Sequence, residues 1–128
     1  MASVLLIDGD RNFREALAIA LRLDGCAVTS AGCGAEALRL LERGGYDLCL
    51  VDLNVSEVEG VLGAAAGNPT PVLVTGPYSD LLEAAARRYP PVRALPKPFA
   101  AAELLAHLVP APTRDATSPS RRRPAPGG

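Results

Sequence analysis

The chain has 128 residues, enough for one domain with a single hydrophobic core. Its formal net charge is −1, but the body through Val109 is mildly acidic and the tail after it is basic. Its longest apolar runs fall far short of the roughly 20 residues that a membrane span needs, and no signal-peptide pattern opens the chain. We therefore expect a soluble, cytoplasmic protein. Because Trp is absent, its core is expected to consist mostly of Leu, Val and Ala.

Few side chains of the kind that carry metal or nucleophilic chemistry are present. Cys26, Cys33 and Cys49 form an odd set without CxxC spacing or a neighbouring histidine, which favours reduced thiols over disulfides or a zinc site. The single histidine, His107, has no evident catalytic partner near the end of the last predicted helix. Triad chemistry and histidine metal sites are therefore excluded.

The first half of the chain alternates apolar runs with amphipathic segments. A buried strand is predicted over residues 4–7, followed by a helix that Asp10 caps and Gly25 stops. Residues 26–29 are predicted as a strand and residues 35–43 as a helix. The next strand, Leu-Cys-Leu-Val before Asp52, is continuously apolar, which favours burial on both faces of a parallel sheet.

The second half continues the alternation but contains one weak helix. After Gly60, only a short helix is predicted, because Gly63 and Gly67 each cost about 1 kcal/mol relative to alanine. The remaining predicted elements are a strand at 72–74, a helix capped by Ser79 and stopped by Pro90, a strand at 92–95 and a helix at 100–108.

Strands that alternate with helices through short connections predict the fold class. The expected fold is α/β, with a doubly wound five-stranded parallel sheet and helices on both faces. Residues 1–109 are expected to form this domain. Residues 110–128, rich in proline and arginine and almost without apolar bulk, are expected to be a disordered tail.

Polar side chains stand where the predicted strands end. They are Asp8 and Asp10 after the first strand, Asp52 after the third, Thr75 after the fourth and Lys97 after the fifth. Because parallel strands end at one edge, where open α/β sheets bind ligands, these groups can converge. Carboxylates, a hydroxyl and an ammonium group are the parts that phosphoryl transfer uses, with Mg²⁺ or an aspartyl-phosphate. For Asp52 alone, a role in starting a turn is the alternative.

Four short motifs surround these residues: LLID, YDLCLVDLN…EG, VTG and LPKPF. Each motif alone is weak, but their spacing makes the set specific. Through them, residues 3–109 resemble the receiver domain of bacterial two-component response regulators, which has a flavodoxin-like fold. The resemblance implies that Asp52 is the phosphoacceptor, with Thr75 contacting the phosphoryl group and Lys97 as its cationic partner. It also implies a Mg²⁺ site at Asp8, Asp52 and the backbone carbonyl of Asn54.

Some positions depart from the family's pattern. Gly9 stands where the family normally has a second acid that ligates Mg²⁺. At about 4 Å and an effective dielectric near 20, that missing charge removes roughly 4 kcal/mol of gross attraction, so we expect a weakened site. Asp10 is a further candidate ligand, although helix capping is favoured. Ala94 stands where the family commonly has an aromatic residue that reports phosphorylation, and Ser56 stands where it usually has a proline. Pro98, in contrast, matches a proline that often follows a cis peptide bond in the family.

Three functions remain open. The leading one is a single-domain response regulator, not an enzyme, that is phosphorylated at Asp52 by a histidine kinase or phosphotransfer protein. It would signal through a downstream protein bound at its fourth helix, fifth strand and fifth helix. Gly9 and Ala94 favour a pseudo-receiver that binds partners without phosphorylation.

The lesser alternative is a haloacid-dehalogenase-type phosphohydrolase with Asp8 as nucleophile and Asp10 as acid/base. This hypothesis leaves Asp52 without a role. Binding of nucleic acid by the three consecutive arginines of the tail is not favoured, since such runs are usually solvated.

Overall fold

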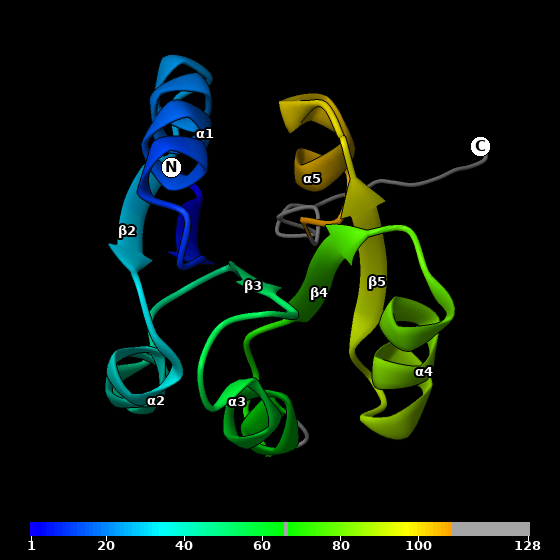
Figure 1. Ribbon diagram of the computed structural model, residues 1–128. Helices are drawn as coiled ribbons and strands as arrows, with labels where there is room; N and C mark the ends of the chain where they lie inside the picture. Colours follow the sequence, from blue (N-terminus) through cyan, green and yellow to red (C-terminus); the bar gives the residue numbers. More distant parts are fainter. Residues whose placement is uncertain (66, 109–128) are drawn as a thin grey trace, which may run out of the picture.

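A parallel sheet forms the middle layer of the structure, a computed structural model that describes residues 1–65 and 67–108 (Figure 1). Its strands are β1 (Ser3–Ile7), β2 (Ala27–Ala31), β3 (Leu48–Asp52), β4 (Val72–Pro77) and β5 (Arg93–Lys97). They lie in the order β2-β1-β3-β4-β5, and every neighbouring pair is parallel. The predicted five-stranded parallel sheet is confirmed, while the predicted tail at 110–128 lies outside the described residues.

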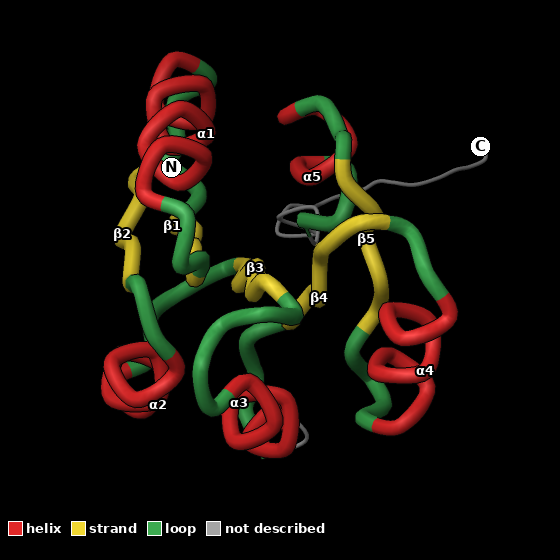
Figure 2. Tube along the Cα trace, viewed as in Figure 1, coloured by secondary structure: helices red, strands yellow, loops and turns green. Residues whose placement is uncertain are grey.

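Helices cover both faces of this sheet, as predicted. They are α1 (Arg11–Leu23), α2 (Gly34–Arg43), α3 (Val58–Ala65), α4 (Asp80–Arg88) and α5 (Ala101–Leu105). Figures 1 and 2 show α1 and α5 on one face and α2, α3 and α4 on the other. None of these helices of the described chain is both long enough and apolar enough to span a membrane.

The central strand β3 shows why the core has two halves. All five of its residues are buried, as its continuous apolar sequence predicts. Because side chains alternate along a strand, Leu48 and Leu50 join the cluster beneath α1 and α5. Cys49 and Val51 join the cluster beneath the other three helices. Both faces of the sheet are therefore packed.

The predicted signals at helix ends operate in the structure. The Asp10 carboxylate caps α1 by accepting from Phe13 N at 3.1 Å, and the Ser79 hydroxyl caps α4 by accepting from Leu82 N at 3.2 Å. Gly25 follows α1 with a φ of 90°, a conformation that glycine adopts without strain. Local chemistry therefore fixes where these two helices begin and where α1 ends.

Two strands are displaced from their predicted positions. β2 spans Ala27–Ala31 rather than 26–29, and β5 spans Arg93–Lys97 rather than 92–95. The pairing of Ile7 with Ala31, and of Pro77 with Lys97, carries both strands beyond their apolar runs. Backbone pairing with a neighbouring strand, which a single sequence does not reveal, sets these ends.

Two helices also differ from the prediction. α3 begins at Val58, before Gly60, and buries Val61, Leu62 and Ala65, so packing outweighs the low helix propensity of its glycines. α5 ends at Leu105 rather than at residue 108. The N–H groups of His107 and Leu108 bond three residues back, to Leu104 and Leu105, at 3.1 and 3.0 Å. Such tightened bonds replace the helical pattern at the end of a helix.

Candidate functional site

Three side chains from three strands meet at the carboxyl edge of the sheet. Asp8 directly follows β1, Asp52 ends β3 and Lys97 ends β5. Lys97 Nζ lies 3.0 Å from Asp8 Oδ2 and 3.1 Å from Asp52 Oδ1. Because β4 lies between β3 and β5, the length of the lysine side chain allows β5 to reach both carboxylates. The structure thus brings these three predicted site residues together.

Each carboxylate is held at both of its oxygens. The second oxygen of Asp8 accepts from the backbone N–H of Asp10 at 2.8 Å, and that of Asp52 accepts from the backbone N–H of Asn54 at 2.9 Å. The two residues are only 5% and 7% exposed. Charge-assisted hydrogen bonds offset the cost of burying carboxylates, so the two groups are fixed in orientation before any ligand arrives.

Lys97 is enclosed by the two acids and an aromatic ring. Its Nζ lies 4.0 Å from the centroid of the Phe13 ring, and Phe99 meets that ring edge-on with centroids 6.0 Å apart. Burial opposes the charged form of Lys97, but its hydrogen bonds to Asp8 and Asp52 and their negative charge outweigh this effect. The pKa of Lys97 is therefore raised above its ordinary value. The pocket holds a permanent cation at neutral pH.

Thr75 lies beside the pocket with its hydroxyl already bonded. It pairs in register with Asp52 and is fully buried. Its Oγ1 donates to the carbonyl of Leu95 on β5. The structure therefore places Thr75 next to Asp52, as predicted, but commits its proton to the neighbouring strand.

Asp10 and Asn54 take part through their backbones. Both side chains are exposed, and each residue donates its N–H to the carboxylate two residues earlier. The Asp10 carboxylate caps α1, the favoured of its two predicted roles. The metal-ligand roles of Asp10 and of the Asn54 carbonyl stay predictions.

The position of Gly9 leaves room for the missing acid. A Cβ atom added there would meet only the Gly32 carbonyl oxygen, at 4.0 Å, and Gly9 has no left-handed φ. The absence of an acid is therefore not imposed by backbone geometry. The oxygen donors of Asp8 and Asp52 suit a hard divalent cation such as Mg²⁺. They offer one charge fewer than the family pattern, and the described residues contain no cluster of three acidic, histidine or cysteine ligands.

Sequence reasoning missed two contributors to the pocket. Arg14 Nη1 donates to the Asp8 carbonyl at 2.7 Å and so fixes the segment that follows β1. Phe13, on α1, is the second contributor, because its ring lies over Lys97. Its place over Lys97 depends on the approach of α1 to β5, which helical periodicity does not report. Pro98 follows a cis peptide bond, as the resemblance implied.

The comparisons with known proteins agree with this geometry. Fold and pocket define the class: a doubly wound α/β domain with an acidic pocket and a lysine at the carboxyl edge of its sheet. A family model, the response regulator receiver domain, matches residues 4–109. The chain belongs to this family, and the resemblance drawn from its motifs is confirmed.

Curated relatives include response regulators of mycobacteria. The transcriptional regulatory protein PrrA of Mycobacterium tuberculosis is 36% identical over 115 residues, which cover 82% of this chain and 47% of PrrA. The response regulator MprA of Mycobacterium leprae is 32% identical over 115 residues, which cover 82% of this chain and 48% of MprA. The chain thus spans about half the length of the curated relatives that it matches.

Solved structures show the same fold. A response regulator of Burkholderia pseudomallei, determined with a phosphorylated aspartic acid, a calcium ion and citrate, matches with a TM-score of 0.74 and 25% identity, over 89% of this chain and 70% of that one. The chemotaxis protein CheY4 of Vibrio cholerae matches with a TM-score of 0.72 and 25% identity, over 83% and 94% of the two chains. The receiver fold is therefore shown for this chain.

Proposed function

We propose that this chain is a receiver module of two-component signalling that accepts a phosphoryl group at Asp52. The observation that carries the proposal is the pair of buried carboxylates, Asp8 and Asp52, bridged by Lys97 at distances of 3.0 and 3.1 Å. Family membership and the phosphorylated aspartate of the Burkholderia relative support it. Catalytic turnover of a separate substrate is not part of the proposed function.

The proposed step is a transfer to a carboxylate oxygen. An oxygen of Asp52 forms a bond to phosphorus as the bond from phosphorus to the donor breaks, and the donor leaves with the electron pair. The donor is a phosphohistidine or a small acyl phosphate. Lys97, already within hydrogen-bonding distance of Asp52, compensates the added negative charge. The backbone N–H of Asn54 orients the carboxylate throughout.

A divalent cation fits this pocket, with reduced affinity. Asp8, Asp52 and the backbone carbonyl of Asn54 would hold it, and Asp10 would join only after leaving its helix cap. A bound Mg²⁺ supplies positive charge to the phosphoryl oxygens. Gly9 contributes no ligand, so we propose that binding needs more Mg²⁺ than in receivers with a second acid.

The two alternatives differ in their support. Ala94 is half-buried on β5 and offers no aromatic ring, and together with Gly9 it still favours a pseudo-receiver as the second candidate. The dehalogenase-type alternative is not favoured by the comparisons. In the structure, the Asp10 carboxylate caps α1 rather than serving as an acid/base beside Asp8.

The proposed partners follow from the family and from the exposed surface. A histidine kinase or phosphotransfer protein would donate the phosphoryl group in the cytoplasm. A downstream protein would dock on α4, β5 and α5, where Arg87 of α4 and Arg93 of β5 are exposed. We propose no nucleic-acid target for this domain.

Acetyl phosphate tests the proposal. Incubation with acetyl phosphate and Mg²⁺ is expected to add the mass of one phosphoryl group to the intact chain. The change Asp52→Asn abolishes the gain, whereas Asp24→Asn, at an exposed aspartate after α1, leaves it unchanged. Absence of any gain at high Mg²⁺ would leave the pseudo-receiver as the better description.

A further inference from the structure

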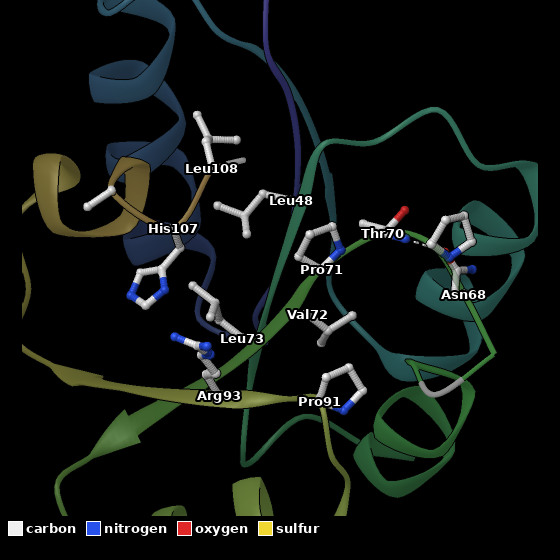
Figure 3. Close-up of a pocket in the computed structure, with 12 residues that line it drawn as sticks. Leu48, Asn68, Thr70, Pro71, Val72, Leu73, Pro91, Arg93, His107 and Leu108 are labelled. Carbon is white, nitrogen blue, oxygen red and sulfur yellow. Dashed lines mark hydrogen bonds between the residues drawn. The ribbon is translucent and has the colours of Figure 1, made fainter. Parts of the chain in front are cut away.

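A second pocket lies at the opposite edge of the sheet from Asp52. It encloses about 480 Å³, a volume within the range of small-molecule sites (Figure 3). Leu48, at the start of β3, lines it, whereas Asp52 ends the same strand. The other lining residues come from the segments that lead into β4 and β5, from the first residues of these strands and from the turn after α5, and they include Asn68, Thr70, Arg93, His107 and Leu108. The proposed phosphorylation chemistry uses none of them.

One wall of this amino-edge pocket is fixed by hydrogen bonds. Asn68 Nδ2 donates to the Leu41 carbonyl at 3.2 Å, and Asn68 Oδ1 accepts from Thr70 N at 2.9 Å. Thr70 Oγ1 donates to the Tyr46 carbonyl at 3.2 Å. These polar groups are committed to the protein, so the wall is preformed rather than waiting for a ligand.

Apart from Asn68 and Thr70, the polar side chains that line the pocket are Arg93 and His107, and both carry nitrogen atoms. Arg93 enters from β5 and His107 from the turn after α5, and Figure 3 shows their polar ends directed to the same side of the pocket. Within residues 1–65 and 67–108, Arg93 makes no ion pair, and no acidic side chain lines the pocket. A guanidinium fork is the side chain best suited to a carboxylate or phosphate.

We propose that this pocket binds a small organic anion. Its carboxylate or phosphate group would contact Arg93 and His107, and its apolar body would pack on the accessible side chains of Pro71, Pro91 and Leu108. The segment after Leu108 is a poor occupant, because it carries four arginines against one aspartate. The proposal does not rest on phosphorylation at Asp52.

The test uses the full chain and three anionic probes: 4-fluorobenzoate, hexanoate and phenyl phosphate. In ¹H–¹⁵N spectra at neutral pH, at least one probe is expected to shift the amides of Val72, Leu73, His107 and Leu108 saturably. The change Arg93→Gln should weaken that binding roughly tenfold, as loss of one charged hydrogen bond does. The matched change Arg87→Gln, at an exposed arginine of α4, should not.

A neutral analogue separates charge from shape. The neutral counterpart of the probe that binds, such as 4-fluorobenzamide for 4-fluorobenzoate, should bind wild type more weakly than the acid and should be insensitive to Arg93→Gln. Equal binding of acid and amide, or no saturable shift with any probe, overturns the proposal. It is also overturned if Arg93→Gln shifts the resonances of residues 109–128, because the tail then occupies the pocket.

Discussion

At the scale of single residues, Lys97 holds the acidic pocket together. Removing it leaves two buried carboxylates close to one another without their shared cation. We expect Lys97→Met to lower the free energy of unfolding by roughly 2–4 kcal/mol, as loss of one partner from a buried ion pair does. Urea denaturation measures this, and Arg87→Met, at an exposed arginine, is the control with little effect.

The charge of Lys97 should also make the free energy of unfolding depend on pH. The folded-state pKa of Lys97 is raised above 10.5, so its stabilisation is complete below that pH and is lost as pH rises through the folded-state value. The difference in unfolding free energy between wild type and Lys97→Met should therefore be constant near neutral pH and shrink above pH 10.5. A difference that stayed constant in strongly alkaline solution would contradict the role given to the lysine charge.

Phe13 contributes to the pocket through its ring. Because Lys97 Nζ lies 4.0 Å from the ring centroid, Phe13→Leu should lower the free energy of unfolding by about 1 kcal/mol through the lost cation–π contact. It should also remove the ring-current shift of the Lys97 Cε protons in NMR spectra. Phe13→Tyr keeps a ring and should retain that shift. If leucine and tyrosine gave the same spectrum, Phe13 would be a packing residue only.

At the scale of elements, the loop after β3 is pinned to the start of α2. Gly34 N donates to the Ser56 carbonyl at 2.9 Å, and a Cβ atom on Gly34 would lie 2.3 Å from that oxygen. We expect Gly34→Ala to cost about 1–3 kcal/mol of unfolding free energy and to disturb the Asn54 amide resonance. A change of less than the error of the measurement would show that the loop moves freely.

A glycine in the next helix provides the matched control. A Cβ atom on Gly60 would meet Leu38 Cδ1 at 3.5 Å, an ordinary contact. Because alanine has the higher helix propensity, Gly60→Ala should raise the free energy of unfolding by about 0.5–1 kcal/mol. The two substitutions therefore have opposite signs, although each adds the same methyl group.

These elements also show how far sequence reasoning reaches. Asp10 and Ser79 were assigned as caps because an N-cap is a contact between near neighbours in the chain. The ends of β2 and β5 were misplaced because they depend on partners far away in sequence, such as Pro77 opposite Lys97. Contacts between distant segments, rather than local propensity, explain these errors.

At the scale of the whole molecule, Cys49 reports global stability. It is fully buried in the central strand, and burial raises its pKa to about 12. A thiol reagent at neutral pH should therefore modify half-buried Cys33 first and Cys49 only after global unfolding. Mass spectrometry of digested samples measures the order of modification. Modification of Cys49 as fast as Cys33 would contradict a sheet packed on both faces.

The sheet topology and most of the candidate site could be predicted from the sequence. Apolar strands that end in polar residues place Asp8, Asp52 and Lys97 at one edge of a parallel sheet. The amino-edge pocket could not be predicted, because Arg93 and His107 belong to different elements and share no motif. Their meeting depends on where α5 ends, which the structure places at Leu105.

The most direct test of the account measures phosphoryl incorporation at Asp52 as a function of Mg²⁺ concentration. Wild type, Gly9→Asp and the neutral isostere Gly9→Asn are compared with acetyl phosphate as donor, and peptide mapping locates the label. We predict labelling of Asp52 in all three, with half-maximal labelling of Gly9→Asp at a Mg²⁺ concentration at least roughly tenfold lower, because one carboxylate is restored. Absence of label at Asp52 in every variant at saturating Mg²⁺ would contradict the proposed function.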